Sequence, residues 1–156
     1  MCGIAGYHGL PADPALLERM NAHQQHRGPD GDGICVDGPC GLAHRRLSII
    51  DIAHGQQPMD TADGRYAIAY NGEVYNHREI ASALRASGVR LRGHGATEVL
   101  VEAIAQWGVN STLDRIDGMY AFGLWDRDQR RLTLVRDRMG EKPLFYGTIG
   151  TGEVLF

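Results

Sequence analysis

A cysteine in the second position places a nucleophile at the start of the chain. If Met1 is removed, which the small side chain of Cys2 permits, Cys2 carries a thiol and a free α-amine on one residue. The ordinary pKa values are ~8.5 for a thiol and roughly 7.7 to 8 for an α-amine, so the amine can take the thiol proton near neutral pH. Cys2 then combines nucleophile and general base. The alternative is a small hydrophobe packed in a buried N-terminal strand.

Asn71 and Gly72 could serve the same chemistry. A thiolate that attacks a carbonyl creates an oxyanion, which needs fixed hydrogen-bond donors. The two residues end a predicted strand and offer a side-chain amide and an unobstructed backbone N–H. Asn-Gly is also the favoured pair of a type I′ turn, which is the structural alternative. The aromatic strand before the pair and Glu-Val-Tyr-Asn after it make a two-residue hairpin less convincing.

Arg45 and Arg46 could bind the carboxylate of an amino-acid substrate, because arginine holds a carboxylate through two parallel hydrogen bonds. The pair adjoins an apolar segment, which leaves one of the two able to point into a site. Solvated surface positions are the alternative for both side chains.

The composition is that of one globular domain. The chain has 156 residues, of which 43% are apolar and 22% charged, enough for a sizeable core. The net charge of −3 is not the positive charge typical of proteins that bind nucleic acid or an anionic membrane. No apolar run approaches ~18 residues and no signal segment opens the chain, so membrane spanning and secretion are not expected. A cytoplasmic location is predicted.

The cysteines and histidines predict neither disulfides nor a metal site. The three cysteines, Cys2, Cys35 and Cys40, favour reduced thiols. Cys35 and Cys40 flank a predicted turn, where they could lie near each other, and are interpreted as packing residues. His23 and His26 are three residues apart on a predicted helix, but no further ligands accompany them.

The pattern of apolar residues and turn signals predicts many antiparallel strands and a few separate helices, an α+β fold. Strands are predicted over residues 2–8, 32–37, 40–45, 66–70, 119–125, 132–135, 144–149 and 154–156. Helices are predicted from Pro14, capped by Asp13, to near His26, and over residues 78–87 and 97–107. Residues 46–51 are predicted to be extended and residues 55–59 to form a loop. Because the last apolar strand has no terminating signal, we expect the N-terminal piece of a longer protein.

Several motifs occur in order along nearly the whole chain. They are Met1-Cys2-Gly3-Ile4-Ala5-Gly6, Arg27-Gly28-Pro29-Asp30-Gly31, His44-Arg45-Arg46-Leu47-Ser48-Ile49-Ile50-Asp51, Gly55-Gln56-Gln57-Pro58, Tyr70-Asn71-Gly72-Glu73-Val74-Tyr75-Asn76-His77, Gly118-Met119-Tyr120-Ala121-Phe122 and Arg136-Asp137-Arg138-Met139-Gly140-Glu141-Lys142-Pro143-Leu144. In this combination the sequence resembles the N-terminal glutaminase domain of class II glutamine amidotransferases, and among them the glutamine-hydrolysing asparagine synthetases.

The resemblance implies a fold and a set of roles. The fold is a four-layer αββα N-terminal-nucleophile hydrolase sandwich, with two antiparallel sheets between helices, over residues 1–156. Cys2 matches the nucleophile that is freed by removal of Met1, and Asn71 and Gly72 match the oxyanion hole. The substrate-binding positions implied are Arg46 for the glutamine carboxylate, the backbone segment Leu47, Ser48, Ile49 and Ile50, Glu73 at the amino-acid end, and the position held by Ala96.

Ala96 departs from the family pattern. Just before Thr97-Glu98-Val99-Leu100 the family usually has an aspartate that pairs with the α-ammonium of glutamine, and here the residue is Ala96. Loss of a charge-assisted hydrogen bond costs on the order of 1.5 to 3 kcal/mol, or roughly ten- to 150-fold in affinity. We therefore predict weak glutamine binding unless Glu73 or another acceptor compensates.

The resemblance also implies partners. The domain would bind glutamine, need no cofactor or metal of its own, and supply ammonia to a C-terminal synthetase domain that binds ATP and magnesium and is absent from this chain. A homodimer is a further possibility that the resemblance raises. The alternatives are an amidotransferase domain for another acceptor, in polysaccharide or secondary metabolism, and a catalytically silent binding module, which Ala96 favours.

Overall fold

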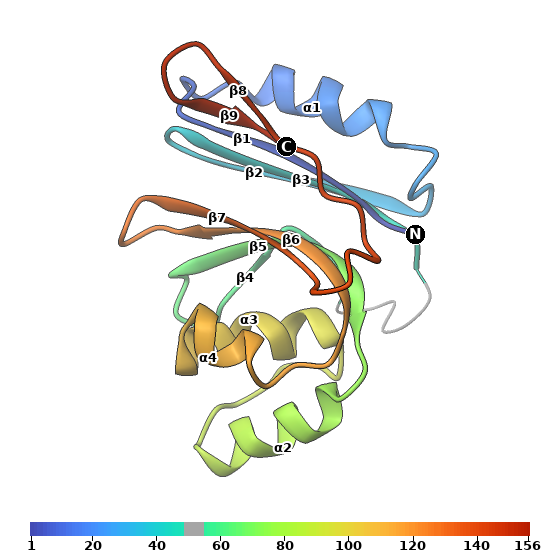
Figure 1. Ribbon diagram of the computed structural model, residues 1–156, viewed down its shortest axis with the longest axis vertical. Helices are drawn as coiled ribbons and strands as arrows, with labels where there is room; N and C mark the ends of the chain where they lie inside the picture. The colour runs from blue at the N-terminus through green and yellow to red at the C-terminus, as the bar shows by residue number, and fades with distance from the viewer. Residues whose placement is uncertain (49–54) are drawn as a thin grey trace.

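The computed structural model, which describes residues 1–48 and 55–156, consists of two antiparallel sheets that face each other (Figure 1). The first sheet has the strand order β2-β3-β1-β9-β8 and the second the order β4-β5-β6-β7. The strands are β1 Gly3–His8, β2 Gly31–Asp37, β3 Cys40–Arg46, β4 Met59–Asp60, β5 Tyr66–Val74, β6 Gly118–Asp126, β7 Arg131–Arg136, β8 Gly147–Ile149 and β9 Glu153–Leu155.

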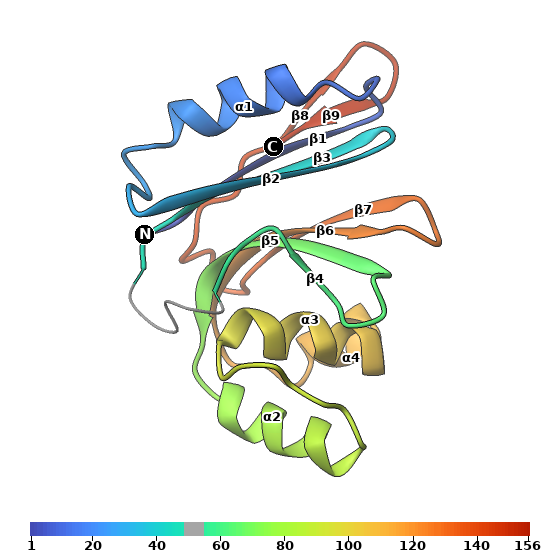
Figure 2. The ribbon, with the colours of Figure 1, turned by 180° about the vertical axis from the view of Figure 1, so that it is seen from behind.

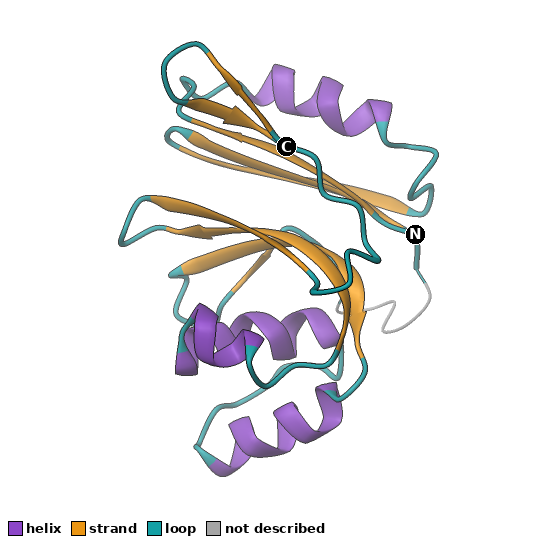
Figure 3. Ribbon diagram, in the orientation of Figure 1, coloured by secondary structure: helices purple, strands orange, loops and turns teal. Residues whose placement is uncertain are grey.

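Helices cover the outer face of each sheet, so the predicted four-layer order αββα is confirmed (Figures 2 and 3). One helix lies on the first sheet and the others lie beyond the second. They are α1 Pro14–His23, and α2 His77–Ala86, α3 Ala96–Trp107 and α4 Val109–Leu113. The Asp13 carboxylate caps α1 by accepting a hydrogen bond from the Leu16 N–H at 2.8 Å, as predicted. No helix in the described part of the chain is long and apolar enough to cross a membrane.

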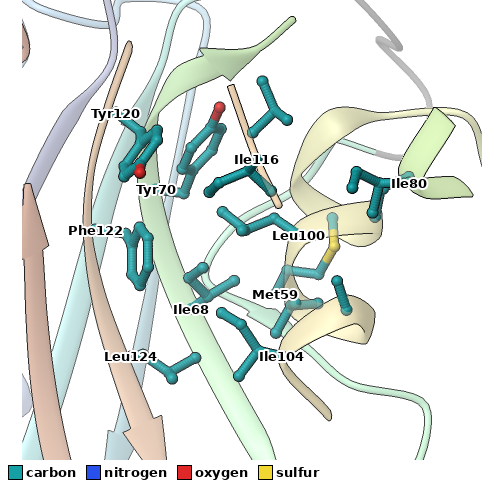
Figure 4. Packing of buried hydrophobic residues seen from close by; sticks show 14 of the residues in the cluster. Met59, Ile68, Tyr70, Ile80, Leu100, Ile104, Ile116, Tyr120, Phe122 and Leu124 are labelled. Atoms are coloured by element: carbon teal, nitrogen blue, oxygen red, sulfur yellow. The ribbon is translucent and has the colours of Figure 1, made fainter. Parts of the chain in front are cut away.

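Strand β6 contributes side chains to two separate buried clusters, one on each face of the second sheet. Its even-numbered residues Tyr120, Phe122 and Leu124 pack toward α3 in one buried cluster (Figure 4). Trp125 packs on the opposite face, with Ala67 and other residues between the two sheets. A strand that is covered on both faces is apolar throughout instead of alternating, which is the pattern read from the sequence.

Several elements differ from prediction in their bounds. The first helix ends at His23, because residues 24–27 form a turn. The predicted loop around Met59 contains the short strand β4, and α4 was not predicted. Strand β5 continues from Tyr70 through Asn71 to Val74, so the type I′ turn is excluded: Asn71 pairs with Ala121 in the ladder. The end of the predicted extended segment 46–51 lies outside the described residues.

Cys35 and Cys40 are free thiols that pack between the sheets, as interpreted. Burial is the main cause that raises the pKa of the Cys40 thiol to about 12. Such a thiol stays protonated near neutral pH and is a poor nucleophile.

His44 is a second titratable group buried inside the sandwich. It lies on β3, is 1% exposed, and neither ring nitrogen has a hydrogen-bond partner among the described residues. Burial lowers the pKa of His44 to about 4, and a nearby backbone group of Tyr70 opposes this shift only in part. The ring is therefore neutral at pH 7.

This burial predicts a pH-dependent stability. An unfolded histidine binds its proton below about pH 6.5, whereas folded His44 does so only below about 4. Because the unfolded state binds more protons between these values, the free energy of unfolding should fall by roughly 3 kcal/mol as the pH falls through that window. Urea unfolding at pH 7 and pH 4.5 should show this fall in the free energy of unfolding for the native chain. The control His23→Leu, at an exposed site, should show the same fall. If the free energy of unfolding of His44→Leu fell by the same amount, the pH dependence would have to come from other groups.

Candidate active site

A cavity of about 350 Å³ lies where the N-terminus meets the second sheet. Its walls come from the N-terminus, the end of β3, the middle of β5, the start of α3 and the connection between β7 and β8. The predicted site residues on these walls are Cys2, Arg46, Leu47, Asn71, Gly72, Glu73 and Ala96. Of the remaining predicted residues, Ser48 does not line the cavity, and Ile49 and Ile50 lie outside the described residues.

Cys2 is held directly before β1 by contacts from two other segments. The Leu47 backbone N–H donates to the Cys2 Sγ at 3.5 Å. The Arg27 guanidinium contacts the Cys2 carbonyl oxygen through Nε and Nη2, each at 3.4 Å. The first contact offers the sulfur a hydrogen-bond donor, and the second fixes the backbone that carries the sulfur.

The motif Arg27-Gly28-Pro29-Asp30 also positions the segment after β3. The Asp30 backbone N–H donates to the Arg46 carbonyl at 3.0 Å, and the Asp30 carboxylate accepts from the Ser48 N–H at 2.8 Å. Gly28 lies so close to the Arg45 backbone that a Cβ there would collide with the Arg45 carbonyl carbon. The motif thus presents Leu47 to Cys2.

The two arginines at the end of β3 point in different directions. Arg45 donates to the Asn21 carbonyl of α1 at 3.1 Å and pairs with Asp32 at 3.5 Å. Arg46 lines the cavity. Successive side chains of a strand face opposite sides, so only one member of the pair can reach the site.

Asn71 and Gly72 lie inside β5, with Asn71 only 5% exposed. Gly72 pairs with Tyr120 of β6, where an added Cβ would collide with the Met119 carbonyl oxygen and approach the Tyr120 Cα to 2.7 Å. A side chain at position 72 therefore has no room beside β6, and Asn71 and Gly72 both line the cavity.

Gln57 and Tyr70 line the cavity without having been predicted as site residues. Gln57 accepts from the Tyr70 backbone N–H at 2.7 Å and donates to the Thr97 hydroxyl at 3.3 Å, so it ties β5 to the start of α3. The Tyr70 hydroxyl is buried without a partner in the described part of the chain. Burial, with the Glu73 and Cys2 charges, raises the pKa of Tyr70 and keeps the phenol neutral. The motifs around both residues were the available signal, but no role followed from them.

Ala96 opens α3 at the cavity wall, between Gly95 and Thr97. Glu98 fixes this end of the helix: its carboxylate accepts from the backbone N–H groups of Arg92 and Gly93, each at 2.7 Å. Burial opposes the charge of Glu98, yet these hydrogen bonds hold its pKa below the ordinary value. A helix N-terminus carries partial positive charge, so the wall at Ala96 repels an ammonium group unless a carboxylate intervenes.

The family model described as the glutamine amidotransferase domain matches residues 1–156. The chain belongs to this family. Over 155 residues it is 39% identical to asparagine synthetase (glutamine-hydrolyzing) 1 of Bacillus subtilis (strain 168), covering 96% of this chain and 24% of that protein. Over 152 residues it is 36% identical to asparagine synthetase (glutamine-hydrolyzing) of Asparagus officinalis, covering 94% of this chain and 25% of that protein. The amidotransferase domain thus spans about a quarter of the length of these relatives.

Solved structures confirm the fold of this amidotransferase domain. Glutamine phosphoribosylpyrophosphate amidotransferase from B. subtilis, complexed with ADP and GMP, superposes with a TM-score of 0.80 at 21% identity. That comparison covers 99% of this chain and 41% of the other. The predicted N-terminal-nucleophile hydrolase sandwich is therefore confirmed. The described residues contain no group of three or more His, Cys, Asp or Glu side chains that could hold a metal ion.

Proposed function

We propose that this chain hydrolyses glutamine to glutamate and ammonia through a thioester on Cys2. The observation that carries the proposal is the meeting of three separate segments in one cavity: Cys2, Arg46 and the Asn71–Gly72 pair. A thiol, a cationic carboxylate ligand and hydrogen-bond donors for an oxyanion are what attack on the side-chain amide of an amino acid requires.

The chemistry follows from these groups once Met1 has been removed. The α-amine of Cys2 takes the thiol proton, and the sulfur attacks the amide carbon of glutamine. The oxyanion is stabilised by the Asn71 amide and the Gly72 N–H. Collapse breaks the C–N bond, and the protonated amine gives its proton to the leaving ammonia. Water then attacks the glutamyl thioester, which releases glutamate and restores the thiol.

The ammonia would pass to an ATP-dependent synthetase domain of the kind that follows in the longer relatives. Large hydrophobic side chains are exposed along the connection before β8: Met139 is 86% exposed, Phe145 83% and Tyr146 72%. Exposed apolar surface of this kind is typical of a contact with another domain. ATP and magnesium would bind in that domain, and the alternative is an amidotransferase that delivers ammonia to an acceptor in polysaccharide or secondary metabolism.

The primary test is an assay of the purified chain with glutamine alone. We expect glutamate and ammonia to appear in equal amounts, with the N-terminal residue identified as Cys2 by mass spectrometry. Absence of glutamate release from a chain with a free Cys2 would contradict the proposal and leave the silent binding module, which Ala96 favours, as the better account.

Ala96→Asp is expected to lower the KM for glutamine by roughly ten- to 150-fold, because it adds a charge-assisted hydrogen bond to the α-ammonium. The new carboxylate would also offset the positive end of α3. Ala96→Asn is the matched control, since it has the same shape without the charge, and it should recover little of the effect. Steady-state kinetics of glutamate release measures both variants. An unchanged KM in Ala96→Asp would mean that another group already binds the amine.

A further inference from the structure

Lys142 is a buried cation that the chemistry above does not use. The residue is 7% exposed and lies on the cavity wall with Cys2. Its ammonium donates to the Met1 sulfur at 3.5 Å and forms no ion pair with a carboxylate in the described part of the chain. A buried ammonium without a negative partner is costly, so its place here requires an explanation.

The backbone of Lys142 is fixed at both of its peptide groups. The Asp137 carboxylate accepts from the Lys142 N–H at 2.9 Å, and the Arg136 Nε donates to the Lys142 carbonyl at 2.8 Å. Asp137 is itself 6% exposed and also accepts from the Tyr120 N–H at 3.2 Å, which anchors the connection to β6. The backbone that carries the Lys142 side chain is thus fixed at the cavity wall.

The same connection borders Cys2 on two sides. Lys142 and Cys2 share the larger cavity, and Pro143, Leu144 and Phe145 line a second cavity of about 260 Å³ that also contacts Cys2. The connection passes beside the N-terminus in both ribbon views (Figures 1 and 2). When Met1 leaves, the ammonium loses its sulfur partner while remaining next to the residue that becomes the N-terminus.

We infer that Lys142 supplies positive charge to the reacting centre and stabilises the negative charge that forms on the Cys2 sulfur. This inference rests on the proposed removal of Met1 and the proposed nucleophile. Of the other acidic and basic side chains lining the cavity, Arg46 belongs to the carboxylate site in that proposal, and Glu73 is an acid and supplies no positive charge. A positive charge on the wall of the same cavity attracts the negative charge of a thiolate, and more strongly in a partly buried site than in water.

The test is the rate at which iodoacetamide alkylates Cys2 at pH 7 in processed protein without glutamine. Lys142→Met keeps the length and apolar stem of the side chain and removes the charge, and the rate should fall about tenfold. Lys142→Arg should restore most of the rate. Arg138→Met is the matched control, because it removes a positive charge from the same connection at a side chain that is 68% exposed and outside the cavity. Mass spectrometry of the N-terminal peptide separates Cys2 from Cys35 and Cys40.

Equal alkylation rates in Lys142→Met and the native chain would overturn the inference. So would a fall of the same size in Arg138→Met, since that would reflect net charge alone. A loss of thermal stability in Lys142→Met that Lys142→Arg also shows would assign a structural role instead. Because the probe needs no turnover, this result is independent of glutamate release: an inactive chain with a fast-reacting Cys2 would contradict only the proposed function.

Discussion

Cys2→Ala is expected to abolish glutamine hydrolysis, with kcat lowered by a factor on the order of 10⁴ or more. Alanine removes the sulfur that is the proposed nucleophile, and the Leu47 N–H that contacts this sulfur at 3.5 Å loses its acceptor. Removal of a nucleophile leaves only the rate that binding and the oxyanion donors provide. Coupled measurement of glutamate formation, with enough enzyme to detect slow turnover, gives the ratio.

Cys35→Ala is the matched control for this loss. Cys35 is a half-buried free thiol between the sheets, and burial is the main cause that raises its pKa. Its replacement should leave kcat within about twofold of the native value, because an exchange outside the cavity leaves the reacting groups unchanged. Glutamate release that persists in Cys2→Ala and disappears in Cys35→Ala would exclude Cys2 as the nucleophile.

An extension that precedes Cys2 is expected to lower kcat by roughly 10² to 10⁴, the range that a positioned general base contributes. A peptide bond to Cys2 removes the basic amine and leaves residues in the cavity, where Met1 already lines the wall. The experiment compares a cleavable N-terminal extension before and after a protease exposes Cys2, with mass spectrometry confirming each N-terminus.

The control for this comparison carries the same extension after Phe156, where it cannot acylate the amine of Cys2. Cleavage should restore activity only in the N-terminal fusion. Full activity with the N-terminal extension in place would mean that another group, or water, accepts the thiol proton. The proposal that the α-amine of Cys2 is the general base would then be wrong.

Much of the secondary structure could be predicted from the sequence, because the spacing of apolar residues reflects which faces of a strand or helix are buried. The uniform apolar run of β6 reflects cover on both faces. The helical period of its apolar residues predicted α3, although the structure buries every residue from Thr97 to Ile104 and not one side alone. The strand β5 was predicted to end at Tyr70, because Asn-Gly is a turn signal in isolation. In the structure, nine paired positions with β6 hold it extended to Val74.

Parts of the candidate site could not be read from local patterns. Cys2, Arg46 and Asn71 were selected by chemical type and by resemblance, and the structure brings them to one cavity. Gln57 and Lys142 have no distinguishing local pattern. Gln57 contacts Thr97 across 40 residues of sequence, and Lys142 lies beside Met1 across 141, and no periodicity encodes such contacts.

The contact between Met1 and Lys142 also sets an order of events during synthesis. The two residues are 141 positions apart, and at ~5 to 20 residues per second the ribosome needs about 7 to 28 s to make the stretch between them. Throughout that interval Met1 cannot form its contact with Lys142, because Lys142 has not yet been synthesised. An aminopeptidase that removed Met1 during synthesis would therefore act before Lys142 reaches the cavity wall, which other segments of the chain have by then begun to form.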